Sequence, residues 1–250
     1  MRRLVALVLI IVAASSTPAL AGVSPYIRFA LDGNRLDMSD FNANIHRDEV
    51  AIQQAGYPAA FSPVGQGVGF NGALGLWILP GFRIGAIASR EHARRDNRLH
   101  VPGEYFYDND LSFYLDEVGG EATLRISRLR GLCLGGQVAQ ARVRGTLAFS
   151  EEWLGGQYYV DASASGKATT YRAFIGIDQT NNTGVAGFLH LGYRFASVGR
   201  LPSQGVESDG YTSTAFTSQT VRFDYSGLYV SCGVGFDFGR GPRGHSDLSF

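Results

Sequence analysis

The chain has 250 residues, 22 basic and 22 acidic side chains, 33 glycines and a single lysine, Lys167. Glycine is present at about twice its ordinary share while 45% of the residues are apolar, which argues against a collagen-like or a disordered chain. The formal charge is zero and Lys and Arg are not clustered, so the sequence lacks the electrostatic footprint of a nucleic-acid-binding protein.

Residues 1–21 have the features of a secretory signal peptide. Arg2 and Arg3 precede an apolar run over residues 4–14, and Ala19 and Ala21 supply the small residues that signal peptidase accepts. The rival interpretation is a membrane anchor, but a helix that crosses a bilayer needs about 20 apolar residues. We therefore expect cleavage after Ala21 and export of the chain that follows.

Apolar residues alternate with small or polar ones from residue 26 onwards, which is the period of a β-strand. The first predicted strand sets Ile27, Phe29 and Leu31 against Tyr26 and Arg28. The other predicted strands cover residues 70–78, 82–91, 121–127, 132–138, 171–178, 185–195 and 221–238.

A short helix is predicted inside the first long connection, between residues 39 and 56. Ser39 or Asp40 can cap its N-terminus, and Gly56, followed by Pro58, can end it. Its apolar face is formed by Phe41, Ile45 and Ile52. We expect this helix to be a packed segment of the connection, at the mouth of the barrel that is predicted below. The functional alternative is a lid or an element that contacts a receptor.

The connections between predicted strands alternate in length. Residues 79–81, 128–131 and 179–184 are short turns, whereas the connections 32–66, 92–111, 142–168 and 197–220 each span about twenty residues or more. Outer-membrane barrels have short periplasmic turns and long external loops, and a soluble sandwich has no reason to separate the two. The pattern predicts an all-β fold: an eight-stranded, antiparallel, up-and-down transmembrane barrel over residues 22–238.

The strand positions opposite the apolar face carry both signs of charge. In a small membrane barrel these side chains face a lumen that side chains can fill, so opposed charges can pair and plug it. The predicted lumen network consists of Arg28, Arg83, Glu121, Arg125, Arg172, Asp178, Arg194 and Asp237. Its role is interpreted as structural, with conduction as the alternative.

Cys133 falls on the inward parity and Cys232 on the outward one, in strands that would not be neighbours, so no disulfide is expected. The two thiols lack the further ligands or the C-x-x-C spacing of a metal or redox site, and neither a cofactor nor a metal is expected. In the second long connection, Asp108 and Asp110 fall short of a calcium loop. The aromatic and acidic segment 104–110 is compatible with a cation or sugar site, and equally with strand ends that extend beyond the membrane.

An enzymatic role is not expected, because nucleophilic catalysis needs a base aligned on the nucleophile. None of the histidines His46, His92, His100, His190 and His245 stands in a spacing that provides one. His190 has inward parity and is interpreted as a lumen histidine whose hydrogen bonds are satisfied.

The segment 231–238 resembles the C-terminal recognition signal of outer-membrane barrels, with Ser231, Gly233, Phe236 and Phe238 in the matching positions. With the signal peptide and the alternating connections, residues 26–238 are similar to small eight-stranded outer-membrane proteins such as the transmembrane domain of outer-membrane protein A and the opacity-type proteins. The resemblance implies outer-membrane lipid as the surroundings and insertion by the barrel assembly machinery. Residues 239–250 extend beyond the signal as a short tail, which departs from the pattern.

The predicted function is that of an integral protein of a Gram-negative outer membrane with a structural role or a surface-loop-mediated binding or adhesion role. One alternative is a narrow, porin-like conduit for small or apolar solutes. The other is a soluble periplasmic barrel that binds a small apolar ligand and turns its apolar face inward.

Overall fold

The computed structural model describes residues 23–126 and 131–238. The predicted signal peptide with Ala19 and Ala21, and the predicted tail 239–250, lie outside the described residues. Among the described helices, none combines the length and the apolar character needed to span a bilayer.

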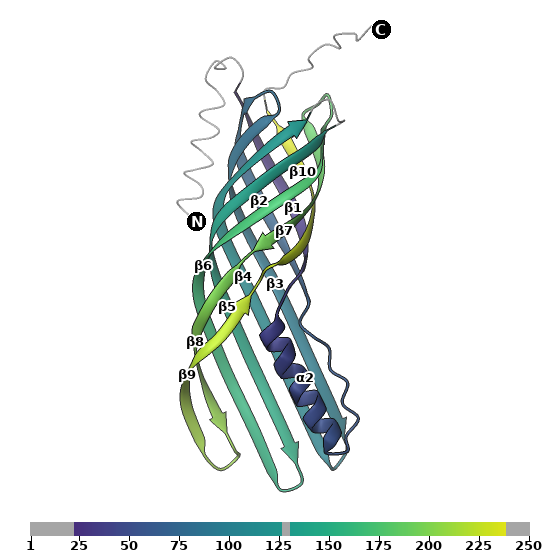
Figure 1. Cartoon of the computed structure of the whole chain (residues 1–250), viewed down its shortest axis with the longest axis vertical. Helices are drawn as coiled ribbons and strands as arrows, with labels where there is room; N and C mark the ends of the chain where they lie inside the picture. The colour runs from purple at the N-terminus through teal and green to yellow at the C-terminus, as the bar shows by residue number, and fades with distance from the viewer. Residues whose placement is uncertain (1–22, 127–130, 239–250) are drawn as a thin grey trace.

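The described residues form ten antiparallel strands and one helix (Figure 1). These elements are β1 (Ser24–Arg35), α2 (Ser39–Gln54), β2 (Gln66–Leu79), β3 (Phe82–Val101), β4 (Tyr105–Ile126), β5 (Leu132–Trp153), β6 (Gly156–Thr180), β7 (Val185–Phe195), β8 (Ser197–Ser208), β9 (Ser213–Asp224) and β10 (Gly227–Asp237).

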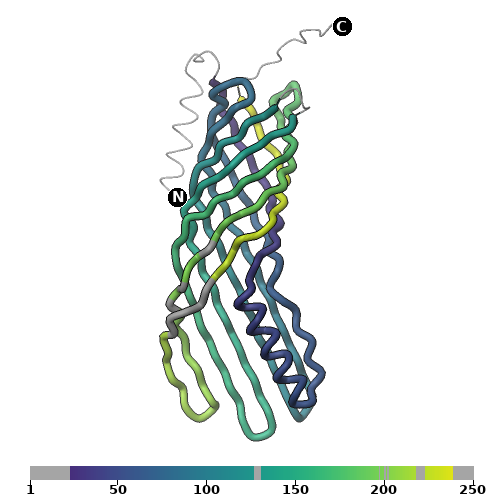
Figure 2. Tube along the Cα trace, viewed as in Figure 1, coloured from purple at the N-terminus to yellow at the C-terminus, as the bar shows by residue number. Residues whose placement is uncertain are grey.

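Eight of these strands close a ring. Strands β1 to β7 pair in chain order, β7 then pairs with β10, and β10 pairs with β1. The predicted eight-stranded antiparallel barrel is therefore confirmed, and Figure 2 shows its strands tilted around a common axis. The prediction of one strand over residues 221–238 is wrong in part, because β9 ends at Asp224 and β10 begins at Gly227.

Three of the four predicted long loops are strands. Residues 92–111 complete the β3–β4 hairpin, residues 142–168 complete the β5–β6 hairpin, and residues 197–220 contain β8 and most of β9. Strand β8 pairs with the outer part of β6, and β9 pairs with β8. These hairpins extend beyond the barrel at the end opposite residues 23 and 238 (Figure 1). We call this part of the molecule, with α2, the outer extension.

The strands continue past the mouth of the barrel, where the apolar residues change from the outward to the inward positions. On β4 the inward side chain changes from Glu117 to Leu115, while the outward side chain changes from Val118 to Asp116. Within the barrel the apolar face is outside; in the outer extension it is inside, as in a water-soluble sheet. Short periplasmic turns and longer external segments place the outer extension on the cell surface.

Helix α2 fills the concave side of the outer extension. Its predicted apolar face is confirmed, since Ile45 and Ile52 are buried and the Phe41 ring lies 4.9 Å from that of Phe113 and 5.3 Å from that of Phe223. The predicted caps differ: Met38 is the N-cap residue and makes no side-chain cap hydrogen bond. Gly56, with φ +94°, follows the helix as predicted. The helix is thus a packed element with an apolar core around it.

Candidate functional site: a filled lumen and an outer pocket

The predicted lumen residues all lie inside the barrel and form more than one cluster. Near the end of β6, Asp178 receives three guanidinium groups. Its carboxylate lies 2.5 Å from Arg83, 3.4 Å from Arg125 and 3.9 Å from Arg28. Four charged side chains therefore meet at that level of the lumen.

A second cluster forms around Arg172, closer to the mouth. Arg172 pairs with Asp32 at 3.1 Å, with Glu91 at 2.7 Å and with Glu117, and Arg194 pairs with the other oxygen of Glu91. All five side chains are buried. Sequence reasoning missed the three carboxylates of this cluster, although Glu91 has the inward parity and extending the alternation through residues 32 and 117 would have found the others.

The two remaining predicted lumen residues, Glu121 and Asp237, accept hydrogen bonds from uncharged side chains. The Tyr26 hydroxyl donates to Glu121 at 2.8 Å, and the Trp77 indole N–H donates to Asp237 at 2.9 Å. Asp237 also accepts from Thr180. These bonds tie β1, β2, β4, β6 and β10 together across the lumen.

His190 is buried in the lumen, and the two cysteines differ in their exposure. The imidazole stacks on Phe174 at 4.4 Å and lies 3.4 Å from Arg28. Cys133 is buried, Cys232 is exposed on the outer wall, and both are free thiols, as their parities predict. Among residues 23–126 and 131–238, no group of His, Cys, Asp and Glu is arranged to hold a metal ion.

The lumen is filled. The void between Arg28, Glu121, Arg172 and their neighbours has a volume of about 10 Å³, which is room for about one water molecule. Side chains therefore close the barrel at its centre.

A closed lumen predicts the absence of ion conduction. Single-channel recording of the refolded protein in a planar bilayer is expected to show no steady conductance, because the Arg172 and Asp178 clusters block the path in succession. A stable unitary current in the wild-type protein would contradict the plug and favour the conduit.

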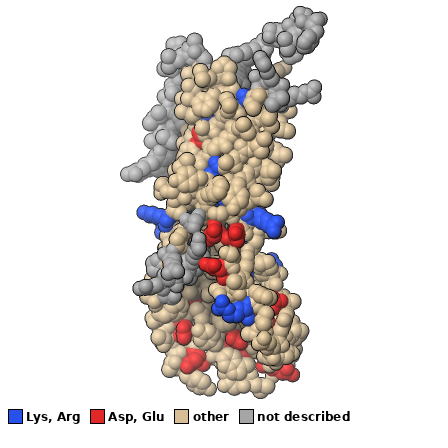
Figure 3. Space-filling view, viewed as in Figure 1, with Lys and Arg blue, Asp and Glu red and all other residues tan. Residues whose placement is uncertain are grey.

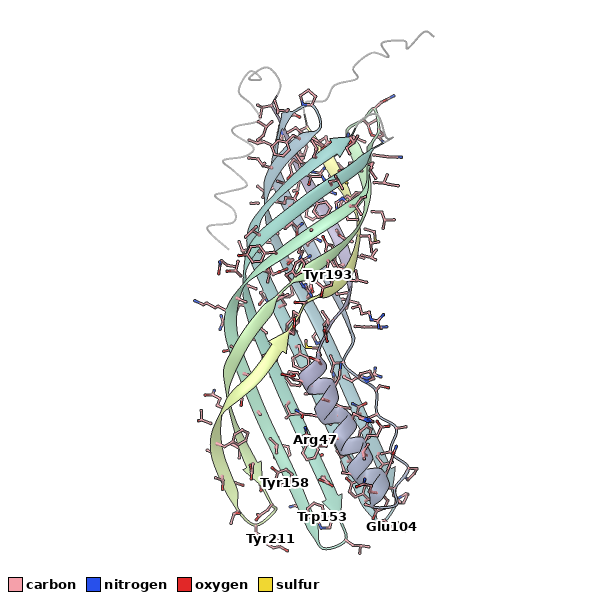
Figure 4. The ribbon with its side chains drawn as sticks, in the orientation of Figure 1. Arg47, Glu104, Trp153, Tyr158, Tyr193 and Tyr211 are labelled. Carbon is pink, nitrogen blue, oxygen red and sulfur yellow. The ribbon has the colours of Figure 1, made fainter. Side chains whose placement is uncertain are left out.

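The outer extension holds an open pocket of about 460 Å³ between α2 and strands β4, β5 and β6. Leu111, Leu147, Phe149 and Val160 form its apolar floor, and α2 forms the opposite wall. The polar residues of its lining are Asp40, Asn44, Arg47, Asp48 and Asn109. Figure 4 shows Arg47 on α2, set back from the hairpin tips that carry Glu104 and Trp153. A volume of this size suits a small organic ligand.

A hydrogen-bonded chain ends inside the pocket. The Asn109 amide donates to the Tyr107 hydroxyl at 3.1 Å, and that hydroxyl donates to Asp48 at 3.2 Å. The Asn109 Oδ1 atom is buried without a hydrogen-bond partner. Burial raises the pKa of Asp48, against the opposing effect of the Tyr107 hydrogen bond. The lining of the pocket therefore includes a residue with an unpartnered acceptor, Asn109, and one carboxylate held in a partly dry setting.

The outer wall of the barrel is an apolar band. Large exposed side chains of this band include Phe29 at 52%, Phe70 at 59%, Leu189 at 52% and Leu191 at 53% exposure. Figure 3 shows that half of the molecule nearly free of charged atoms on the face in view. A soluble barrel would turn such side chains inward, so the soluble alternative does not fit the structure.

A closed antiparallel barrel with an apolar wall and an ionic interior is a membrane-spanning β-barrel, the class of protein found in bacterial outer membranes. No family model matches the sequence, and no curated protein matches it.

Among solved structures, Neisserial surface protein A is similar at 15% identity, with 87% of this chain and 99% of that chain covered and a TM-score of 0.41. CarO of Acinetobacter baumannii is similar at 16% identity, with 67% and 93% covered and a TM-score of 0.40. Outer membrane protease OmpT of Escherichia coli is similar at 10% identity, with 90% and 100% covered and a TM-score of 0.44. At these identities the likeness concerns the fold alone.

Proposed function

We propose that this outer-membrane barrel is a surface binding protein that captures a small amphipathic molecule in the pocket beside α2. The observation that carries the proposal is a pocket with an apolar floor whose polar lining includes the carboxylate of Asp48 and Asn109, a residue with a buried, unpartnered Oδ1. A buried acceptor without a donor costs free energy, and a ligand N–H or O–H group would remove that cost.

The lining indicates the chemistry of the ligand. Leu147, Phe149 and Val160 suit an apolar or aromatic body. Two carboxylates, Asp40 and Asp48, stand against the single guanidinium of Arg47, so the polar end favours a cation that can also donate to Asn109. An aromatic amine meets all of these requirements.

Surface binding suits this architecture better than conduction does. The ionic clusters fill the lumen, whereas β4, β5 and β6 extend outward and build the pocket together with α2. In this proposal the filled barrel anchors the protein in the membrane, and the outer extension binds the ligand.

The test uses tryptamine as the probe and indole-3-propionate as its partner probe with a carboxylate in place of the amine. Titration calorimetry on the full chain in lipid nanodiscs is expected to show binding of tryptamine and much weaker binding of indole-3-propionate. Asp48→Asn is expected to weaken tryptamine binding about tenfold, the effect of losing a hydrogen bond to a charged group. Leu147→Trp is expected to abolish it, because the indole ring would occupy the floor.

The matched control is Thr146→Trp, which adds the same ring on the exposed outer face of β5. It is expected to leave the tryptamine affinity unchanged. Equal binding of both probes, or equal loss in Thr146→Trp and Leu147→Trp, would contradict the proposed pocket.

A further inference from the structure

The outer face of strands β3 to β6 carries a row of charges in register with one another. Arg90, Asp116, Arg142 and Lys167 occupy directly opposite register positions on these four strands. Arg144 lies on the same face of β5, two residues further out. We call these five residues the cationic row.

The cationic row contains more positive charge than it can neutralise itself. Asp116 is 2.5 Å from Arg90 and 2.8 Å from Arg144, and it is the only carboxylate of the row. Arg142 and Lys167 have no ion-pair partner among residues 23–126 and 131–238. Four cations thus share one carboxylate.

The register makes this excess unfavourable in the protein alone. Arg142 and Lys167 are directly opposite each other on neighbouring strands, which lie about 4.8 Å apart. Like charges in such a pair destabilise a sheet, whereas opposite charges would stabilise it. Lys167 is the only lysine of the chain. An anion from outside the protein would relieve this repulsion.

The position of the row indicates where that anion comes from. On β5 and β6 the last apolar pair is Val138 with Tyr171, and the first polar pair is Gln140 with Thr169, joined at 3.0 Å. Arg142 and Lys167 follow two residues further on, about 7 Å along the strands. Figure 3 shows basic side chains projecting at both flanks where the nearly uncharged half of the molecule ends. This is the level of lipid headgroups above the hydrocarbon core.

We propose that the cationic row binds the phosphate of an anionic lipid in the outer leaflet, with Arg142 and Lys167 as its main ligands and Arg144 beside them. A guanidinium fork matches phosphate oxygens in a bidentate manner, and the ammonium group adds a point charge. Long basic side chains can keep their charge at this depth while their stems cover apolar surface. The site is independent of the pocket beside α2.

The test is native mass spectrometry of the full chain released from micelles, titrated with phosphatidic acid and, separately, with phosphatidylcholine. Wild-type protein is expected to retain phosphatidic acid in preference to phosphatidylcholine. Each basic residue near a lipid surface contributes about 1 kcal/mol, so Arg142→Gln is expected to lower the affinity for phosphatidic acid about fivefold. The double variant Arg142→Gln with Lys167→Gln is expected to lower it more than tenfold.

The control is Arg98→Gln, which removes one positive charge, as Arg142→Gln does, but from an exposed arginine near the outer tip of β3. It is expected to keep the lipid preference of the wild type, and a heat-modifiable gel band reports that each variant is folded. Three outcomes would overturn the proposal: no preference for phosphatidic acid, an equal loss in Arg98→Gln, or displacement of the lipid by inorganic phosphate at equal concentration, which would make this a site for free phosphate.

Discussion

Arg172→Leu is expected to lower the free energy of unfolding by about 3–5 kcal/mol, the cost of breaking a buried ion pair. The guanidinium of Arg172 neutralises Asp32, Glu91 and Glu117 in the lumen, and leucine would leave these carboxylates buried without their main partner. Arg194 would still pair with Glu91, so the loss falls on the other two. Urea titration of the barrel folded into vesicles measures the effect.

Two further variants separate the buried charges from a general effect of losing an arginine. Adding Glu117→Gln to Arg172→Leu is expected to recover part of the lost stability, because one uncompensated carboxylate is removed. Arg90→Leu, which breaks an exposed pair with Asp116, is expected to leave the stability almost unchanged. Equal losses in Arg172→Leu and Arg90→Leu would mean that the lumen cluster does not stabilise the barrel.

The membrane-spanning half of the fold could be predicted from the sequence because its alternation is regular. From Val185 to Phe195, for example, every second residue meets lipid, and the structure has one strand with the same bounds. The strands of the outer extension were predicted as loops because the expected apolar face was followed in one parity only. Between Val118 and Asp116 the apolar residues change to the other parity. In the sequence this change resembles the end of a strand. It is consistent with one continuous strand only if the outward face meets lipid on one side of that point and water on the other.

The candidate sites also differ in how far the sequence could predict them. The eight lumen residues named from the sequence lie in the regular strands, and parity alone orients them. Asp32 fell in a stretch predicted as a loop, and Glu117 fell between the predicted loop 92–111 and the predicted strand 121–127, so their charges were not assigned to the lumen. The pocket depends on α2 lying against β5 and β6, a contact between segments about one hundred residues apart that no local pattern encodes.

The cationic row was hidden for a related reason. Arg142 and Lys167 are 25 positions apart, and only the register of the β5–β6 hairpin brings them into opposition. With a loop predicted over residues 142–168, both would have been ordinary solvated charges. Their significance comes from the hairpin and from the level of the apolar band below them.

Leu189→Arg is expected to cost about 2–4 kcal/mol of stability in the bilayer, the value for an arginine that faces lipid near the midplane of a barrel. Leu189 is 52% exposed on the outer wall at the middle of β7, where a guanidinium cannot reach either headgroup layer without distortion. Val230→Arg, on the neighbouring strand β10, is expected to behave in the same way. Urea titration in vesicles measures both.

The two controls for this prediction change residues that do not face lipid. Ser163→Arg introduces the same side chain on the outward face of β6 beyond the cationic row, opposite the uncharged Thr146, and it is expected to have little effect, since that face meets water. Ser231→Thr changes a buried lumen position while keeping the hydroxyl near Asn71, and a small effect is expected there too. If arginine were tolerated equally at Leu189 and Ser163, the apolar wall would not face lipid, and the inverted alternation would need another explanation than a change of solvent.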